Sequence, residues 1–337
     1  MSTTQGALER LLNHIWYGNS FLSWCLIPLT WPVRWVVHRR RQQASPKGST
    51  PEGVTVIVVG GLTAGGTGKT PVLIGLGKWL AERGYRVGVV SRGYDGTHGP
   101  EPLSVTEGDT AAVVGDEPLL IRRELGAPVV VCTDRKRALD VLVDQGAVDV
   151  VLSDDGLQHY PMPRDIELLV LDAERGLGNG RLLPAGPLRE PASRLTNVDV
   201  VLERNSCDPD RGFSYQPSGA LHLASGRQVR WSECVAEWRD QSMVAMTGLG
   251  QPRQFFEMLR GQGLAIEAES LGDHEAMTQA HLDRRNEKVL LMTAKDAVKL
   301  SECTDPRVWV VAIEVALPSS LLTKLTALLP SARFVEA

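Results

Sequence analysis

A short stretch of small residues that ends in lysine and threonine, Thr63-Ala-Gly-Gly-Thr-Gly-Lys69-Thr70, has the composition of a phosphate-binding loop. Its glycines let backbone N–H groups point at phosphate oxygens, Lys69 would reach the β- and γ-phosphates, and Thr70 would hold Mg²⁺. Such loops read G-x-x-x-x-G-K-[ST], and Thr63 stands here in place of the first glycine. The stretch therefore predicts a bound nucleoside triphosphate and Mg²⁺. The predicted nucleotide-binding residues are Thr63, Ala64, Gly65, Gly66, Thr67, Gly68, Lys69 and Thr70.

Two carboxylates follow a predicted buried strand, Val148–Leu152. Asp154 and Asp155 would stand at the carboxyl end of that strand, where open α/β sheets bind ligands. P-loop enzymes place such an acid beside the loop to hold the metal, so either residue could serve Mg²⁺. The alternative is an Asp-Asp-Gly turn with solvated carboxylates. Gln158 and His159 follow closely, where they could meet a substrate, although a lone surface histidine is usually inert.

Two further acidic positions have an ordinary structural interpretation from the residues alone. Asp116 and Glu117 lie at the expected start of a helix, where acidic side chains usually act as caps or as partners of the helix dipole. Asp273 and His274 form a carboxylate–imidazole pair, which in most proteins would be part of a surface loop. The residues alone therefore assign no catalytic or binding role to either the Asp116–Glu117 pair or the Asp273–His274 pair.

Strands that alternate with helices must position these side chains. Short β-branched runs alternate with helical stretches from Val54 onward, and this alternation predicts an α/β fold, a mostly parallel sheet with helices on both faces. Pro71 is placed to begin the helix after the phosphate-binding loop and Gly84 to end it. The expected strands are Val54–Val59, Arg86–Val90, Pro128–Cys132, Val148–Leu152, Ile166–Leu171 and Val198–Leu202.

A second series of strands and helices follows a polar, turn-rich stretch at Gly212–Gly219. We therefore expect a P-loop domain over residues 46–215 and a smaller C-terminal α/β domain over residues 216–337 that closes over the site. The strands expected in the second domain are Met243–Thr247, Lys288–Thr293 and Val308–Val315.

The first 45 residues differ from the rest of the chain. Between Arg10 and Arg34 there is no Asp, Glu, Lys or Arg, and four of the eight tryptophans lie within these first 45 residues. Tryptophan favours membrane interfaces, whereas Pro28 and Pro32 would interrupt a spanning helix. A helix half-buried in the membrane surface fits best, and a spanning helix or a helix packed on its own protein are the alternatives. The tryptophans are Trp16, Trp24, Trp31 and Trp35, and the cationic cluster suited to anionic headgroups is Arg34, His38, Arg39, Arg40 and Arg41.

Bulk composition narrows the function classes. The 337 residues are 43% hydrophobic, ample for a sizeable core, and the formal net charge is −4 with a pI of about 6.0. That charge provides no global positive field for nucleic acid, so any anion must be bound locally. The five cysteines are scattered without a C-x-x-C pair, which fits neither a disulfide framework nor a zinc cluster and indicates a reducing compartment. No nucleic-acid partner and no obligate protein partner is expected.

Several short motifs, in order along most of the chain, resemble those of one family, the tetraacyldisaccharide 4'-kinases that phosphorylate the lipid A precursor. Threonine at position 63 is part of that family's loop, so this departure from the usual pattern supports the resemblance. The family often has Asn where Gly61 stands, and His or Tyr where Glu275 stands. The matching motifs are Leu62–Pro71, Ser91–Tyr94, Gly115–Pro118, Asp134-Arg135, Ser153–His159, Leu183–Glu190, Gly248–Gly250, Asp273-His274 and Lys295–Lys299.

The resemblance implies roles for individual residues. In that family a carboxylate–histidine pair deprotonates the sugar hydroxyl, which assigns Asp116 and His274 to catalysis together with Lys69. The implied Mg²⁺ ligands are Thr70, Glu117, Asp154 and Asp155, and the implied contacts to phosphate or acceptor are Arg92, Arg135, Gln158, His159 and Arg189.

The resulting expectation is an ATP-dependent kinase on the cytoplasmic face of the bacterial inner membrane. It would transfer the γ-phosphate to the 4'-hydroxyl of a tetraacyldisaccharide 1-phosphate, an acylated disaccharide lipid. A membrane-recruited nucleotide switch that controls a protein partner is the alternative. Guanine specificity is disfavoured because no N-K-x-D segment follows the sheet strands, and Thr293-Ala-Lys-Asp296 has its lysine in the wrong place. A soluble kinase of a small metabolite would leave the tryptophan-rich segment unexplained.

Overall fold

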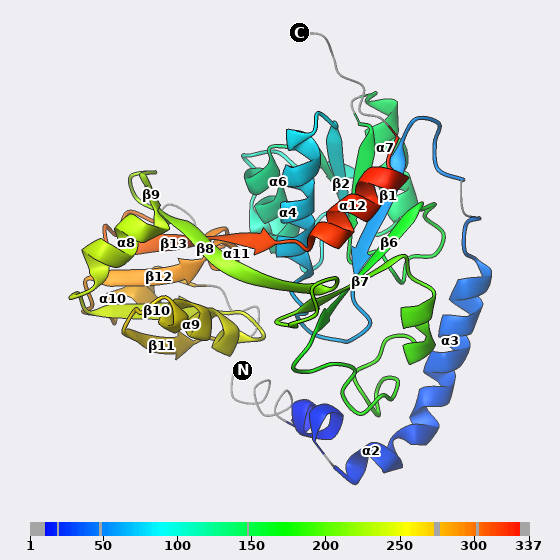
Figure 1. The fold of residues 1–337 in the computed structure, drawn as a ribbon, viewed down its shortest axis with the longest axis horizontal. Helices are drawn as coiled ribbons and strands as arrows, with labels where there is room; N and C mark the ends of the chain where they lie inside the picture. The colour runs from blue at the N-terminus through cyan, green and yellow to red at the C-terminus, as the bar shows by residue number, and fades with distance from the viewer. Residues whose placement is uncertain are drawn as a thin grey trace.

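Two lobes joined by two long strands make up the molecule (Figure 1). The computed structural model describes residues 11–18, 20–46, 49–146, 148–272, 277–300 and 303–330. The predicted catalytic residue His274 lies outside the described residues, so its pairing with Asp116 stays a prediction.

A mostly parallel sheet forms the larger lobe, as expected. The β-branched run of β1 (Thr55–Gly60) is buried along its whole length, because it pairs in parallel with β5 (Val150–Asp154) on one side and β6 (Ile166–Asp172) on the other. The strand order is β7-β6-β1-β5-β2-β4-β3, and β3 alone in this series runs antiparallel to its neighbour. The remaining strands are β2 (Val87–Ser91), β3 (Leu103–Ser104), β4 (Val129–Val131) and β7 (Val200–Arg204).

Helices cover both faces of this sheet. The helices α4 (Lys69–Glu82) and α6 (Asp116–Leu125) pack on one face, and α7 (Arg135–Asp144) packs on the other. Pro71 is the third residue of α4, where its missing N–H breaks no helical hydrogen bond, and Gly84 follows the helix with a φ of 82°. The sequence signals therefore predict the limits of α4 to within about two residues. Two shorter elements complete the lobe, α5 (Ala111–Val114) and a 3₁₀ turn, η2 (Ala192–Thr196).

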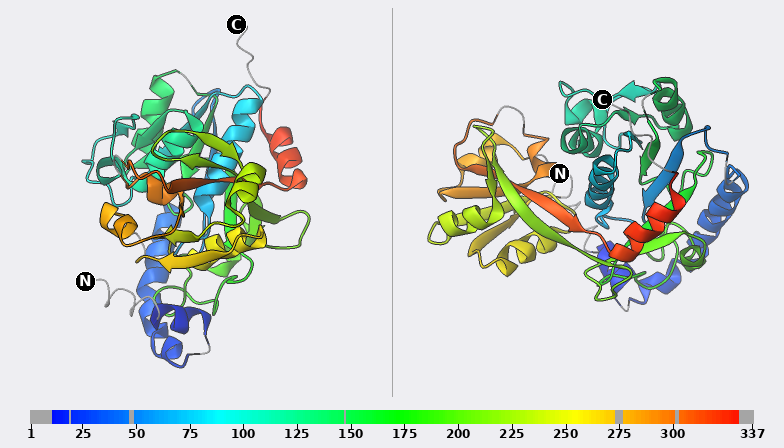
Figure 2. Two further views of the ribbon diagram at one scale, coloured as in Figure 1. Left: turned by 90° about the vertical axis from the view of Figure 1, so that its left-hand side faces the viewer. Right: turned by 45° about the horizontal axis from the view of Figure 1, so that its top comes forward.

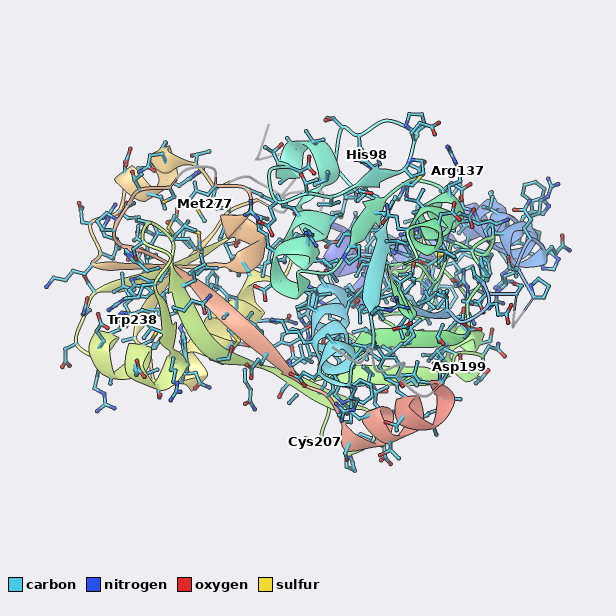
Figure 3. All side chains as sticks on the ribbon, turned by 90° about the horizontal axis from the view of Figure 1, so that it is seen from above. His98, Arg137, Asp199, Cys207, Trp238 and Met277 are labelled. Atoms are coloured by element: carbon cyan, nitrogen blue, oxygen red, sulfur yellow. The ribbon has the colours of Figure 1, made fainter. Side chains whose placement is uncertain are left out.

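The smaller lobe is a second sheet with its own core. Its strands lie in the order β11-β10-β12-β13-β8 and run parallel, except that β13 (Val308–Ala316) is antiparallel to β8 (Gly212–His222). Trp238 lies within this lobe (Figure 3). Its ring packs edge-on against Trp231 and Trp309. The other elements are β9 (Gln228–Arg230), α8 (Trp231–Trp238), β10 (Met243–Thr247), α9 (Pro252–Gly261), β11 (Ile266–Ser270), α10 (Gln279–Asp283), β12 (Val289–Thr293) and α11 (Ala294–Ala297).

The stretch Gly212–Gly219, which reads as polar and turn-rich, is part of a strand rather than a break between domains. At its start β8 pairs in parallel with β7, and over most of its length it pairs with β13, so it joins the two sheets. Its polar residues are tolerated because the strand is only partly buried. The expected boundary between residues 215 and 216 therefore falls inside β8.

The end of the chain returns to the larger lobe. The helix α12 (Ser319–Leu328) places Leu321 and Leu325 in the same core as α4, and the right-hand view of Figure 2 shows it against that lobe. Lys324 donates a hydrogen bond to the carbonyl of Asp199, which lies beside α12 in Figure 3. The expected C-terminal domain is thus divided in space, because the apolar side chains of its helix α12 are covered by the first lobe.

The tryptophan-rich segment is broken into short helices. In its described part, residues 11–17 are helical. They are followed by α2 (Leu22–Cys25), a 3₁₀ turn (Ile27–Leu29) and α3 (Thr30–Gln42), which runs along the outside of the larger lobe (Figure 1). Pro28 lies in the 3₁₀ turn and Pro32 in the first turn of α3, as expected of residues that interrupt a longer helix. Within the described residues, no helix is both long enough and apolar enough to cross a membrane.

Candidate active site

The predicted phosphate-binding loop joins the end of β1 to the start of α4. Its last glycine, Gly68, has a φ of 81°, a conformation that L side chains rarely adopt, and a Cβ there would lie 1.9 Å from the Tyr215 hydroxyl. Lys69 begins α4, and its Nζ lies 3.5 Å from Oδ1 of Asp155. A helix N-terminus and an ammonium group therefore lie together at the loop, which suits a chain of phosphates.

Thr63 can replace the usual first glycine because the chain is paired at this point. It forms an antiparallel bridge with Leu188, and the N–H of Ala64 donates to the carbonyl of Pro187 at 2.8 Å. A backbone held in this way does not need the conformational freedom of glycine. The segment 183–190 thus holds the beginning of the loop.

Asp154 and Asp155 follow one another at the end of β5, beside the loop. Burial, together with the negative charges of Glu117 and Asp155, raises the pKa of Asp154 to about 7. Burial also disfavours the charged form of Asp155, but Lys69 and Arg189 outweigh it and hold the pKa of that carboxyl well below its usual range. The two neighbouring carboxyls therefore differ in pKa. Lys69 and Arg189 stabilise the ionised form of Asp155, whereas the ionised form of Asp154 needs a further cation.

This side of the site fits a Mg²⁺ ion. Oδ1 of Asp154 is buried and accepts no hydrogen bond from the described residues, so a cation there would offset an otherwise costly charge. Glu117 is close enough to raise the pKa of Asp154, and Thr70 lies in the first turn of α4. In the described part of the chain, no group of three His, Cys, Asp or Glu side chains could hold a metal by itself. Mg²⁺ does not need one, because it keeps waters and takes phosphate oxygens as ligands.

Arg135 and His159, predicted to contact phosphate or acceptor, are turned partly toward the protein. The guanidinium of Arg135 is buried and donates hydrogen bonds to the backbone carbonyls of Asp154 and Asp155 at 2.9 and 3.1 Å. His159 Nε2 lies 3.6 Å from Oδ1 of Asp134, and burial and the charge of Arg135 lower the pKa of His159 to about 4. Arg135 thus holds the turn that carries the two acids, and His159 is neutral near pH 7.

Gln158, Arg189 and Arg92 border the open part of the site. Gln158 donates to the carbonyl of Gly61 at 3.1 Å and to Oε1 of Glu190 at 3.0 Å. Arg189 forms an ion pair with Asp155, the residue after β5, and Arg92 follows β2 and is exposed. Two guanidinium groups therefore stand at the cavity wall, where they suit anionic groups of a ligand.

Asp116 and Glu117 begin α6 on the side of the smaller lobe. Asp116 is buried, and its Oδ1 accepts a hydrogen bond from the N–H of Glu117 at 2.9 Å. Two lysines of the smaller lobe reach this pair. Nζ of Lys299 lies 3.2 Å from Oδ2 of Asp116, and Nζ of Lys295 lies 2.9 Å from Oε1 of Glu117. A partnership with the helix dipole does not by itself account for ion pairs that cross between lobes.

A cavity of about 1490 Å³ brings most of the predicted site residues together. Among the described ones, only Thr63, Ala64 and Asp116 are absent from its walls. Those walls come from both lobes and from α3, which contributes Pro32 and Val36. The space can therefore take a ligand that extends from the phosphate-binding loop to the N-terminal segment.

Residues that the sequence does not single out also reach the loop from β8 and the smaller lobe. Tyr215 and Gln251 donate hydrogen bonds to backbone carbonyls of the loop at 2.5 Å each. No sequence signal marks either residue, because each contact joins segments distant along the chain. Lys295 and Lys299 do have a signal, because they are the two ends of the motif Lys295–Lys299 that carries part of the family resemblance, although that resemblance assigns neither lysine a role.

The chain is similar to proteins of one family along nearly its whole length. The model of the family described as LpxK, tetraacyldisaccharide-1-P 4'-kinase, matches residues 22–330. A tetraacyldisaccharide 4'-kinase of Alcanivorax borkumensis is 40% identical over 326 residues, which cover 95% of this chain and 97% of that protein. One of Legionella pneumophila strain Corby is 38% identical over 317 residues, 92% of this chain and 94% of that protein. The crystal structure of an "apo" form LpxK from Aquifex aeolicus in complex with ATP matches 92% of this chain and 100% of that one, with a TM-score of 0.74 and 26% sequence identity.

Proposed function

Since this chain belongs to the tetraacyldisaccharide 4'-kinase family, we propose that it transfers the γ-phosphate of ATP to the 4'-hydroxyl of a tetraacyldisaccharide 1-phosphate. The observation that carries this proposal is the cavity in which the loop, the acids of β5 and the start of α6 converge. Because α3 forms another part of its wall, an acceptor with a polar head and long acyl chains could contact both regions.

Family membership confirms the resemblance predicted from the short motifs. It also confirms a P-loop kinase that uses ATP and Mg²⁺, with a mostly parallel α/β sheet. A nucleotide switch that controls a protein partner is accordingly disfavoured.

In phosphoryl transfer the protein contributes mainly positioning and electrostatic stabilisation. In the proposed mechanism Lys69 turns from Asp155 to the β- and γ-phosphates when the nucleotide binds. Bound Mg²⁺ would be held by Asp154, Glu117 and Thr70, and it would neutralise charge on the phosphate oxygens. The loop and the N-terminus of α4 hold the phosphate chain in place, so that the γ-phosphate faces the acceptor.

The direct test incubates the purified protein with Mg-ATP and a disaccharide 1-phosphate lipid, and follows the lipid by mass spectrometry. We expect a product that carries a second phosphate, and we expect Lys69→Met to remove that product. Hydrolysis of ATP without a phosphorylated lipid would contradict the proposal and favour the switch.

Asp116 is the proposed base, because a sugar hydroxyl is a poor nucleophile until its proton is being taken. Its carboxylate is buried at the start of α6, next in the chain to Glu117, which lines the cavity, and it pairs with Lys299 of the smaller lobe. His274 is the proposed partner that orients Asp116, by the logic that lets one group position another in catalytic triads.

This base assignment predicts a specific kinetic pattern. Asp116→Asn and His274→Gln should each lower kcat much more than they raise the KM for ATP. The double variant should be little slower than the slower single variant, because the two residues act as one unit. If Asp116→Asn mainly weakened the binding of Mg-ATP, Asp116 would be a metal or nucleotide ligand instead.

The tryptophan-rich segment is the proposed contact with an anionic membrane surface at the cytoplasmic face of the inner membrane. Trp24, Trp31 and Trp35 are 62%, 74% and 59% exposed, although water-facing tryptophan is unfavourable. Trp16 differs, because its indole N–H donates to the carbonyl of Pro184 at 3.0 Å and so attaches the segment to the protein. Three of the four tryptophans therefore support the membrane contact, and Trp16 supports packing of the segment on its own protein.

Vesicle sedimentation tests the membrane contact without removing the segment. We expect the full chain to bind vesicles that contain anionic lipid, less strongly as salt is raised, and Trp31→Ser/Trp35→Ser to reduce binding sharply. Leu328→Ser is the control, since Leu328 is 50% exposed but lies on α12. Equal binding by the double variant and the full chain would refute the assignment of this surface.

A further inference from the structure

A small helix of the smaller lobe, α11, and the turn that follows it lie next to Asp116 and contribute ion pairs between the lobes. Nζ of Lys299 lies 3.2 Å from Oδ2 of Asp116, and Nζ of Lys295 lies 3.6 Å from the same oxygen and 2.9 Å from Oε1 of Glu117. The helix concerned, α11, packs against α6, which Asp116 begins. One carboxylate oxygen thus faces two ammonium groups from the other lobe.

Both lysines are held in place rather than solvated. The side chain of Lys299 is 10% exposed and that of Lys295 is 19% exposed, while that of Asp116 is 7% exposed. Lysine is seldom buried unless its charge is paired, because desolvation and the loss of side-chain freedom both cost free energy. Exposed ion pairs constrain little, but these are shielded from water and so restrict the carboxylate.

The helix that carries Lys295 and precedes Lys299 is itself anchored. Asp296 is almost fully buried, and its carboxylate accepts hydrogen bonds from the hydroxyls of Thr247 at 2.7 Å and Thr293 at 2.6 Å and from the N–H of Gly248 at 2.9 Å. Val298, which lies between the lysines in sequence, packs against the core of the larger lobe. Rotation of α11 would therefore break contacts in both lobes.

The charges around the acidic pair explain why cations are needed there. Glu117 is close enough to Asp154 to raise its pKa, so the carboxylates of α6 and β5 repel one another. Lys69 and Arg189 lie at Asp155, where they form ion pairs at 3.5 and 2.8 Å. Lys295 of α11 and Lys299 of the turn that follows it supply positive charge to the other side of this acidic group.

We propose that Lys299 and Lys295 are positioning residues for phosphoryl transfer, which hold the carboxylates of Asp116 and Glu117 in the orientation that the reaction needs. This inference rests on the proposed function, in which Asp116 accepts the sugar proton. A base must be held within hydrogen-bond reach of its proton, and a displacement of about 1 Å costs on the order of 100-fold in rate. Because the lysines belong to the smaller lobe, Asp116 is oriented in this way only while the lobes are in contact.

The experiment measures steady-state transfer from radiolabelled ATP to the lipid acceptor for Lys299→Met, Lys299→Arg, Asp116→Asn and the double variant Lys299→Met/Asp116→Asn. Lys299→Met should lower kcat by on the order of 10- to 100-fold and change the KM for ATP by less than about threefold, since it acts through the carboxylate. Lys299→Arg should recover most of that loss because it restores the charge. The double variant should be no slower than Asp116→Asn alone.

A matched control lies at the other end of β12, the strand that leads into α11. Lys288 immediately precedes β12, is exposed, and lies at the opposite end of that strand from α11. Lys288→Met should leave kcat unchanged. Calorimetric binding of ATP and thermal melting of each variant separate a positioning effect from misfolding.

The outcomes distinguish this inference from the function on which it rests. An unchanged kcat for Lys299→Met, beside an inactive Asp116→Asn, would overturn the positioning role and leave the proposed base intact. A normal rate for Asp116→Asn would refute the base itself. Losses that multiply in the double variant would also overturn the positioning role. If Lys299→Met does not fold, we expect Lys295→Met to lower kcat and Lys299→Arg to keep a near-normal kcat. An unchanged kcat for Lys295→Met beside a lowered kcat for Lys299→Arg would refute the proposal.

Discussion

Replacement of Asp154 by asparagine should stabilise the metal-free protein while it abolishes phosphoryl transfer. Asp154 is 2% exposed, and its carboxyl accepts a hydrogen bond from the Ser91 hydroxyl that an asparagine oxygen can also accept. The site therefore tolerates a neutral group of the same shape. The carboxylate is retained at a cost in stability because Mg²⁺ needs its charge.

The magnitude follows from the pKa of Asp154. This carboxyl titrates near pH 7 in the folded chain and near 3.8 without the fold, because burial and the charges of Glu117 and Asp155 disfavour its ionised form. A folded state that holds its proton more tightly than the unfolded state loses stability as the pH rises between these two values. The loss is complete above about pH 7 and amounts to on the order of 4 kcal/mol. Asp154→Asn should gain free energy of unfolding of that order at about pH 8, and the gain should shrink as the pH is lowered.

Urea denaturation in EDTA at about pH 8 and about pH 5.5 measures this difference, and the lipid-transfer assay measures activity. Asp155→Asn is the matched control, since Lys69 and Arg189 hold the pKa of Asp155 low and its charge stabilises the fold. Asparagine tolerates the φ of 46° at that position, so the control should be destabilised by loss of charge alone. If Asp154→Asn lowered the free energy of unfolding, or if it kept a near-normal rate, the interpretation of Asp154 as an uncompensated metal ligand would be refuted.

Two further predictions concern a histidine and an anchored aspartate. Because burial and Arg135 lower the pKa of His159 to about 4, its ring should show no titration by NMR between about pH 5.5 and 8, and a midpoint above about pH 6 would contradict that environment. Asp296→Asn should lower the free energy of unfolding by about 2–4 kcal/mol in urea denaturation, since the buried carboxylate accepts three hydrogen bonds. Asp283→Asn on α10, whose carboxylate accepts an exposed hydrogen bond from Gln279, should change stability by less than about 0.5 kcal/mol. An equal loss in both variants would contradict the anchoring role of Asp296.

Local patterns in the sequence were sufficient to predict the phosphate-binding loop and most of the strands around it. The loop after a β-branched run predicts β1, the turn and α4, because each depends on residues next to one another in the chain. The same holds for the two acids at the end of β5. The polar stretch Gly212–Gly219 does not follow such a rule, because it becomes a strand through pairing with β13, roughly a hundred residues away.

Tertiary contacts decided which side chains face the site and which support it. The resemblance implies that Arg135 contacts phosphate or acceptor, and the fold shows in addition that its guanidinium holds the backbone of Asp154 and Asp155. Thr63 is a departure from the usual loop pattern, and the fold pairs it with Leu188. Lys299 reaches Asp116 only because α11 packs on α6. The sequence by itself therefore determined the local geometry of the loop and the position of the acids along the chain, through glycine conformation, β-branched runs and helix signals. The partners of those acids, and hence their charge states, depend on desolvation and on distances between residues far apart in sequence, which only the folded chain sets.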